Sequence, residues 1–399
     1  MSTAGIVCEY NPFHKGHKYH VDRTRELLGE DTDIVCVISG DFVQRGEAAI
    51  MTKFARAEAA CRCGADLVVE LPLPWSLASA ERFAAGAVSI LAALGAEHLS
   101  FGAENEETES LGELARITLE PDFQAAVREK LGRNAALSYP AARQLVLEDR
   151  AGKSSELIER PNNILAVEYL KAIYSQGLRM EPLAVGRVGS GHDELGGGRL
   201  RSAADIRTML GQDGKVFPYM PPESCAVLRR ERTKGRLLTD RTLLDTAILS
   251  RLRMLKPDAF DALPDAADGA GRRLYNAVRT EGTLEAVLAA AKTKRFTMSR
   301  LKRIAMCAAL GVTAELAEKL PPYARVLAAN EKGCAILGRA SENPSIPILS
   351  KPASVLRCAD TVRDVFTLGA DAHDLYTLGF RDAEERKAGR DWRTSPKIV

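Results

Sequence analysis

The sequence predicts an α/β fold: a parallel sheet with helices on both faces in the N-terminal half, followed by a mainly helical and basic segment. Two observations predict the sheet. Short, continuous apolar runs alternate with segments of helical periodicity, and chemically versatile polar residues follow the ends of several of these runs. Apolar strands separated by helices are typical of parallel sheets that are buried on both faces.

The expected elements follow one another in a regular order. The predicted strands are residues 5–8, 34–38, 67–71 and 97–102, with a later one over residues 183–188. The predicted helices between the first four strands cover roughly residues 17–28, 52–63 and 80–94. A further short strand is predicted within residues 346–352, near the C-terminal end.

Polar residues mark the carboxyl ends of the predicted strands. His14 and His17 follow the first strand, residues 40–47 follow the second, and Gly102 ends the fourth. Ligands of open parallel sheets bind beyond the carboxyl ends of the strands. We therefore expect one functional site at this edge of the sheet.

Bulk composition narrows the class of protein. A chain of 399 residues exceeds one ordinary domain, so two or three domains are expected. No apolar run reaches the roughly 18 residues needed to cross a membrane, and residues 1–4 lack the features of a signal peptide. The eight cysteines show no paired zinc-ligand spacing. We expect a reduced, cytoplasmic protein with no structural metal and no membrane contact.

The composition changes after about residue 215, where Pro218, Pro221 and Pro222 mark a boundary. We therefore divide the chain into residues 1–215 and 216–399. Residues 228–256 carry nine Lys and Arg against three Asp and Glu, and residues 271–303 carry nine against two. Such stretches suit a polyanionic partner, and Phe296 could stack on a base there. Solvated helix faces are an equally good interpretation.

The turn after the first strand is the most informative segment. Residues 11–17 read Asn-Pro-Phe-His-Lys-Gly-His, and a helix is expected to begin near Gly16 or His17. A helix N-terminus offers unpaired N–H donors and a partial positive charge, which imidazole donors would reinforce. Together these groups make a phosphate site, and a Cβ at position 16 would crowd a phosphate against the backbone.

Six motifs carry a resemblance that is more specific than this turn. They are residues 9–17, 39–47, 66–72, 101–104, 153–154 with 161–165, and 202–207. This set resembles the bacterial tRNA(Met) cytidine acetate ligase family, within the His-x-Gly-His nucleotidyltransferase superfamily. The resemblance runs nearly end to end and is densest before residue 210. One departure is Ala48, where the family pattern leads us to expect proline.

The resemblance implies a fold and a reaction. Residues 1–215 would form a Rossmann-like nucleotidyltransferase domain that binds ATP, and residues 216–399 a mainly helical, basic domain that binds tRNA. Acetate would attack the α-phosphate of ATP, with Mg²⁺ accompanying the nucleotide, to give acetyl-adenylate and pyrophosphate. The N4 amine of the wobble cytidine of elongator tRNA(Met) would then take the acetyl group, giving N4-acetylcytidine and AMP.

The resemblance also implies site residues. The catalytic pair would be His14 and His17, which stabilise charge on the α-phosphate. The ATP-binding residues would be Val7, Cys8, Glu9, Tyr10, Asn11, Pro12, Phe13, His14, Lys15, Gly16, His17, Lys18, Tyr19, His20, Gly102, Asn162, Asn163, Arg187, Ser202 and Arg207. The tRNA-binding residues would be Arg229, Arg230, Lys294 and Arg295.

Several of these residues have expected roles. Gly102 would let the backbone approach adenine or ribose, Arg187 would neutralise phosphate, and Ser202 with Arg207 would grip the β- and γ-phosphates. One of Asn162 and Asn163 would contact the nucleotide while the other caps a helix. His20 is more typical of a packing or hydrogen-bonding residue, and Arg45 could contact acetate or tRNA. Asp41 with Glu47 could attract Mg²⁺, but a pair of loop carboxylates more often stays solvated.

Two other functions fit parts of the sequence. An adenylyltransferase acting on a small phosphorylated acceptor would use the same N-terminal site but would not need the basic helical segment. A non-catalytic RNA-binding protein would need the basic segment alone, and the intact His14, Gly16 and His17 argue against it. The sequence leaves the oligomeric state and the basis of acetate selectivity open.

Overall fold

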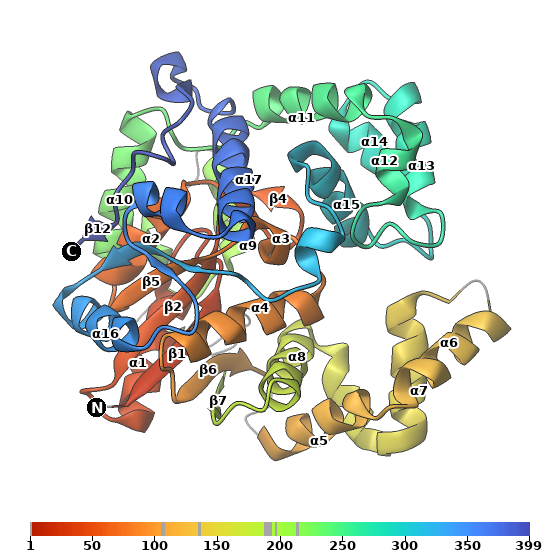
Figure 1. Cartoon of the computed structure of the whole chain (residues 1–399), viewed down its shortest axis with the longest axis horizontal. Coiled ribbons are helices and arrows are strands. Elements are labelled where there is room, and N and C mark those ends of the chain that lie inside the picture. Colours follow the sequence, from red (N-terminus) through yellow and green to blue (C-terminus); the bar gives the residue numbers. More distant parts are fainter. Residues whose placement is uncertain (1, 105–107, 135–136, 187–193, 196–197, 213–214) are drawn as a thin grey trace.

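A computed structural model describes residues 2–104, 108–134, 137–186, 194–195, 198–212 and 215–399 (Figure 1). A mixed sheet with the strand order β11-β10-β5-β2-β1-β6-β7 runs through the middle of the molecule. The parallel strands are β1 (Thr3–Cys8), β2 (Asp33–Ser39), β5 (Leu67–Leu71), β6 (His98–Ala103) and β7 (Glu181–Gly186). The first four predicted strands are thereby confirmed to within two residues at each end. The strand predicted over residues 183–188 is confirmed as far as residue 186, and residues 187 and 188 lie outside the described residues.

One edge of the sheet comes from the C-terminal part of the chain. Strand β10 (Ala324–Ala329) lies antiparallel to β5, while β11 (Ile348–Leu349) and β12 (Lys397–Ile398) lie parallel to β10. The strand predicted within residues 346–352 is therefore present as β11. The α/β fold class is confirmed. The domain boundary at residue 215 stays a prediction. Strands from beyond that residue, β10, β11 and β12, complete the sheet.

The side chains of β2 point alternately to the two faces of the sheet, which explains why helices cover both faces. Val35 and Val37 join one core with α4 (Ala80–Ala93), α5 (Thr108–Leu119) and α8 (Pro161–Ser175). Ile34, Cys36 and Ile38 join a second core with α1 (Lys15–Leu28), α2 (Lys53–Arg62) and α10 (Pro222–Thr233). Successive side chains of a strand point to opposite faces, so a continuous apolar run fills both layers.

A third core belongs to the helical part of the chain. It is built from α11 (Thr242–Met254), α12 (Pro257–Asp261), α13 (Ala270–Thr280), α14 (Leu284–Ala291) and α15 (Met298–Leu310), which Figure 1 shows as a bundle beside the sheet. Phe42 of the hairpin β3 (Phe42–Val43) and β4 (Glu47–Ala48) enters this core, as does Tyr376 of α17 (Asp360–Thr377). The hairpin and α17 thus join the bundle to the sheet layer.

The remaining elements are shorter or lie at the periphery. They are α3 (Leu73–Ser76), α6 (Phe123–Arg133), α7 (Tyr139–Ala151), α9 (Ala203–Gly211), α16 (Glu331–Glu342) and the β8 (Glu194–Leu195) and β9 (Gly198–Arg199) ladder. Short 3-10 helices occupy Gly152–Glu159, Phe217–Tyr219, Glu315–Ala317, Pro352–Arg357 and Ala383–Arg386. Within the described residues, no helix combines the length and apolar character needed to cross a membrane.

A buried cluster of charges lies between the sheet and the C-terminal segment. The ammonium of Lys53 lies 2.8 Å from a carboxylate oxygen of Glu70 and 2.8 Å from one of Asp391. Arg325 lies 2.6 Å from the same Asp391 oxygen. All four side chains are at most 5% exposed. Charges so deeply buried must be paired, which ties the last residues of the chain to the sheet.

Candidate active site

A cavity of about 800 Å³ lies at the carboxyl ends of β1, β6 and β7, and we refer to it as the main cavity. Of the residues predicted to bind ATP, those that line it are Val7, Cys8, Glu9, Tyr10, Asn11, His14, Gly16, His17, Tyr19, His20, Gly102, Asn162 and Ser202. Pro12, Phe13, Lys15, Lys18, Asn163 and Arg207 do not line it, and Arg187 lies outside the described residues. The structure thus brings most of the predicted set to one place.

The turn after β1 is held by hydrogen bonds from three directions. The side-chain oxygen of Asn11 accepts a bond from the backbone N–H of Ile50 at 2.9 Å, and its carbonyl accepts one from Arg207 at 2.9 Å. Phe13 is fully buried, and its carbonyl accepts a 2.8 Å bond from the Ser224 hydroxyl. The turn is therefore anchored by α9, by α10 and by the segment between β4 and α2.

The two histidines form the start of α1. His14 is the N-cap, and its Nδ1 accepts a hydrogen bond from the Gly16 N–H at 3.0 Å. The Nδ1 of His17 accepts one from the His14 N–H at 3.3 Å, so the pair forms a reciprocal cap. The rings stack with centroids 3.7 Å apart. Because each Nδ1 is an acceptor, the proton of each neutral ring sits on Nε2, which is a donor.

Gly16 is explained by the first of these rings. A Cβ added there would lie 2.9 Å from Cε1 and 3.1 Å from Nδ1 of His14. Any side chain would therefore push His14 out of its capping position. The predicted reason, crowding of a phosphate, is thus joined by a second one that lies within the protein itself.

His20 faces the same cavity one turn further along α1. Its Nε2 lies 2.9 Å from the Ser100 hydroxyl, which in turn lies 2.7 Å from the hydroxyl of the buried Thr24. This chain of hydrogen bonds fixes α1 against β6. The structure therefore gives His20 the hydrogen-bonding role that was expected, at a position that also lines the cavity.

The opposite wall is the start of α8. Asn162 is half-buried and donates to a carboxylate oxygen of Glu104 at 2.5 Å. Asn163 is buried, accepts from the Glu104 N–H at 3.1 Å and donates to the Leu157 carbonyl at 2.9 Å. The N-cap of α8 is Arg160, so the expectation that one asparagine caps this helix is wrong. Of the two, Asn162 is the one at the cavity.

The start of α9 supplies a third wall. Ser202 is the N-cap, and its hydroxyl accepts from the Asp205 N–H at 3.1 Å, while the Asp205 carboxylate accepts from the Ser202 N–H. This capping box orders the helix start beside the cavity. Arg207, one turn later, reaches behind the histidine turn to Asn11 rather than into the cavity.

Three arginines that line the main cavity stand out, and two of them were missed. They are Arg45, Arg160 and Arg201, and within the described residues none forms an ion pair. Arg45 was expected to contact acetate or tRNA, whereas Arg160 and Arg201 were not singled out. Arg160 is the N-cap of α8, and Arg201 directly precedes Ser202, the N-cap of α9. Their place near a helix start is the only signal that the sequence offers for these two arginines. Three such charges favour a polyanionic ligand such as a triphosphate.

Comparison with known proteins agrees with this geometry. The model of the HIGH nucleotidyl transferase family matches residues 1–391. The tRNA(Met) cytidine acetate ligase of Acetivibrio thermocellus is 34% identical over 98% of both chains, and that of Kosmotoga olearia is 35% identical over 98% of both. This chain belongs to the tRNA(Met) cytidine acetate ligase family.

Solved structures of this family extend the likeness to the whole fold. The structure of Thermotoga maritima TmcAL bound with alpha-thio ATP matches with a TM-score of 0.90 and 32% identity, covering all of both chains. The apo structure of the same protein matches with a TM-score of 0.92. The family resemblance inferred from the six motifs is confirmed.

The loop carboxylates considered as a possible Mg²⁺ site, Asp41 and Glu47, are paired with cationic side chains. Asp41 is buried, lies 2.7 Å from Nδ1 of His373, and accepts the Lys53 N–H at 2.8 Å. Glu47 lies 2.5 Å from the Lys302 ammonium. Neither lines the main cavity, so the interpretation of this pair as a metal site is wrong. Nor do the described residues contain a group of three potential metal ligands.

Glu9 is the carboxylate closest to the histidine turn. One of its oxygens accepts the Gln44 N–H at 3.1 Å. Burial raises the pKa of Glu9, and the arginines around it offset only part of that effect. Behind it, the fully buried Arg56 donates to the carbonyls of Glu9, Ser39 and Gly40, which holds the ends of β1 and β2 together.

The residues predicted to bind tRNA fall into two separate groups. Arg229 lies over the ring of Phe217 with 4.3 Å to its centroid, and Arg230 pairs with Glu58 at 2.8 Å. Lys294 and Arg295 are exposed beyond α14, on the far side of the molecule from α10 (Figure 1). Phe296 is only 6% exposed, within the third core, so the prediction that it stacks on a base is wrong.

Proposed function

We propose that this chain is an ATP-dependent tRNA(Met) cytidine acetate ligase. It activates acetate as acetyl-adenylate and transfers the acetyl group to N4 of the wobble cytidine, position 34, of elongator tRNA(Met). The product is N4-acetylcytidine. The observation that carries the proposal is the stacked pair His14 and His17 at the start of α1, on the wall of the main cavity. Family membership over the whole chain supports it.

In the first step, an acetate oxygen attacks the α-phosphorus of ATP. The bond from that phosphorus to the bridging oxygen breaks, and pyrophosphate leaves with the electron pair. Negative charge builds on the non-bridging oxygens of the α-phosphate, where the Nε2 donors of His14 and His17 stabilise it. One well-placed donor of this kind lowers the barrier by about 3–4 kcal/mol.

Positive charge around the cavity would hold the rest of the triphosphate. Arg45, Arg160 and Arg201 line the cavity, and Ser202 starts a helix beside them. Arg207 fixes the turn through the Asn11 carbonyl and adds its charge from behind. Gly102 and Asn162 line the opposite side, where we place the nucleoside. Arg187 stays a predicted phosphate ligand.

Mg²⁺ would enter with ATP. This ion binds through one or two carboxylates and substrate phosphates rather than an all-protein cage. Glu9 and Glu104 are carboxylates that line the main cavity, so the donor set suits an ion held mainly by the triphosphate. When bound, the ion would neutralise phosphate charge.

In the second step, the N4 amine of the cytidine attacks the acetyl carbonyl carbon. A C–N bond forms, the bond from the carbonyl carbon to the phosphate oxygen breaks, and AMP leaves while N4 loses a proton. The basic groups that would bind the tRNA are Arg229 and Arg230 on α10 and Lys294 with Arg295 beside the bundle. Phosphate contacts of this kind position an RNA without reading its sequence.

The reaction is tested with purified protein, ATP, labelled acetate and unmodified elongator tRNA(Met), followed by digestion and mass spectrometry of the nucleosides. We expect the label in N4-acetylcytidine, with AMP and pyrophosphate formed in equal amounts. Omitting acetate should abolish both products. ATP consumption that does not depend on acetate, with transfer of AMP to a small phosphorylated acceptor, would contradict the proposal. It would indicate an adenylyltransferase.

A further inference from the structure

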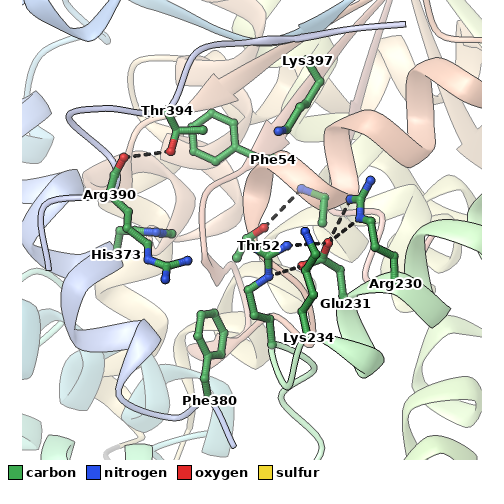
Figure 2. A pocket seen from close by; sticks show the side chains of 12 residues that line it. Thr52, Phe54, Arg230, Glu231, Lys234, His373, Phe380, Arg390, Thr394 and Lys397 are labelled. Atoms are coloured by element: carbon green, nitrogen blue, oxygen red, sulfur yellow. Dashed lines mark hydrogen bonds and ion pairs between the residues drawn. The ribbon is translucent and has the colours of Figure 1, made fainter. Parts of the chain in front are cut away.

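We propose that a second cavity, lined by residues at the start of α2, at the end of α10 and in the C-terminal segment, binds a backbone phosphate of the tRNA. This inference rests on the proposed function. The cavity holds about 240 Å³, and its charged lining includes Arg230, Lys234, Arg236, Arg390 and Lys397 (Figure 2). We refer to it as the basic cavity.

The charge of the basic cavity is not fully compensated. Five Lys and Arg line it, against one carboxylate, that of Glu231. The three arginines are held by neighbouring acids: Arg230 and Arg236 each lie 2.9 Å from Glu231, and Arg390 pairs with Glu385. Within the described residues, neither Lys234 nor Lys397 forms an ion pair. The arginines are thus fixed in place, while two lysines retain uncompensated charge.

The preference for cations at a helix C-terminus does not explain all of the Lys and Arg residues that line the basic cavity. Cations are favoured near a helix C-terminus, which explains the basic residues at the end of α10. Arg390 and Lys397 come from the C-terminal segment, more than 150 residues later, and the fold brings them to the same space (Figure 2). Two separate segments therefore contribute positive charge to one cavity.

The size and lining of the basic cavity suit a small anion. Its volume is below the roughly 300–1,000 Å³ of most small-molecule sites, and a single water occupies about 30 Å³ in the liquid. The rings of Phe54 and Phe380, which are 5% and 1% exposed, add apolar surface to its lining. A single phosphate group held by cations from several sides fits these features.

The position of the basic cavity suits an RNA strand that reaches the main cavity. Ile50 bonds to Asn11 of the main cavity, and Thr52, two residues later, lines the basic cavity. Along α10, Ser224 contacts the histidine turn and Lys234 lines the basic cavity. Ten residues of helix span about 15 Å, which equals roughly four to five nucleotides of a stacked strand.

The test is the double substitution Lys234→Ala with Lys397→Ala, which removes the two unpaired charges and leaves the arginines and the histidine turn intact. Affinity for unmodified elongator tRNA(Met) is measured by fluorescence anisotropy over a range of salt concentrations. Acetate-dependent ATP–pyrophosphate exchange is measured without tRNA. The control is Lys332→Ala with Lys351→Ala, which removes the same charge from exposed positions on and beyond α16.

We expect the test variant to bind tRNA about tenfold more weakly, with a salt slope reduced by about one, as the loss of one phosphate contact predicts. Exchange should stay within twofold of the wild type, and the control should bind tRNA as the wild type does. A test variant that matches the control in affinity and slope would overturn the basic cavity as an RNA site. So would a loss of exchange with tRNA affinity intact, which would indicate bound pyrophosphate. A wild-type chain without acetate-dependent exchange would instead overturn the proposed function.

Discussion

His14 and His17 serve two purposes at once. Each Nδ1 completes the N-terminal cap of α1, so the same bonds that begin the helix also fix the tautomer of each ring. Their Nε2 donors are therefore set before any substrate arrives, and a donor set in advance lowers a barrier more than one that must reorganise.

Replacing His17 with Ala should lower acetate-dependent ATP–pyrophosphate exchange by a hundredfold or more, because it removes a donor to the α-phosphate. Affinity for tRNA should stay within twofold. The matched control is His98→Ala, since His98 lies at the opposite end of β6 beside Glu181. An exchange rate for His17→Ala equal to that of the control would remove His17 from the mechanism.

The buried pair of Asp41 and His373 should make stability depend on pH. Burial lowers the pKa of His373, but the charge and hydrogen bond of Asp41 outweigh it, so the pKa lies above its usual 6.5. Burial raises the pKa of Asp41, yet His373 and Lys53 bring it below its usual value. A histidine whose pKa is higher in the folded than in the unfolded protein stabilises the fold fully at a pH below its unfolded-state pKa. This stabilisation is lost as the pH rises through its folded-state pKa.

We therefore expect the stability difference between the wild type and His373→Gln to be largest near pH 6. It should shrink above pH 6.5, by up to about 1.4 kcal/mol per pH unit. Asp41 does not titrate in this range, because its pKa is lowered. Urea unfolding at each pH from 6 to 9 measures the difference. A difference that stays constant with pH would show that folding does not shift the pKa of His373, and one that grows as pH rises would show that folding lowers it.

How much of the site the sequence predicts depends on how local its determinants are. The histidine turn is predictable because its strand, turn and helix start lie within about twelve residues. Arg160 and Arg201 are not, since a single arginine before a helix has no distinguishing pattern until the fold brings it to a cavity. Phe296 shows the opposite failure: flanking cations suggested exposure, but tertiary packing buries the ring.

At the level of elements, the β3–β4 hairpin connects the two functional parts of the molecule. Gln44 and Arg45 of its turn line the main cavity, while Glu47 pairs with Lys302 of α15. Gly46 has a φ of +73°, and a Cβ there would lie 2.5 Å from the Lys302 carbonyl carbon. Only glycine lets this turn lie so close to the helix backbone.

Replacing Gly46 with Ala should lower the free energy of unfolding by about 2–3 kcal/mol, through backbone strain and overpacking against α15. Gly338→Ala is the control, because Gly338 lies in helix α16 with open space around it. That substitution should leave stability unchanged or raise it by up to about 1 kcal/mol. Equal stabilities of the two variants in urea unfolding would show that the hairpin does not rest on α15.

The sequence predicts the parallel strands of the sheet but not the antiparallel strand β10. The parallel strands are found from their apolar runs because each one is buried on both faces. Strand β10 was not predicted, although all of its residues except Arg325 are apolar. Its place beside β5 depends on a pairing between residues more than 250 positions apart, and no local pattern encodes that partner.

At the level of the whole molecule, the C-terminal segment closes back onto the sheet. Asp391 accepts from both Lys53 and Arg325, and it is fully buried. Burial raises its pKa, but these two cations and His373 outweigh that effect and hold the pKa well below its usual value. The division at residue 215 stays a prediction, and the last residues of the chain pack against the sheet.

Replacing Asp391 with Ala should lower the free energy of unfolding by about 3–5 kcal/mol, because Lys53 and Arg325 would share the single carboxylate of Glu70. Asp364→Ala is the control, at an exposed position of α17, and should change stability by less than about 0.5 kcal/mol. Urea unfolding at pH 7 measures both. A loss below about 1 kcal/mol for Asp391→Ala would show that the C-terminal segment is dispensable to the fold.

The most direct test of the account is a crystal structure of this chain with a non-hydrolysable ATP analogue. We predict that a non-bridging oxygen of the α-phosphate lies about 3 Å from Nε2 of His14 or His17. We also predict that the outer phosphates lie among Arg45, Arg160 and Arg201. A triphosphate bound away from the start of α1, with neither histidine in contact, would contradict the mechanism.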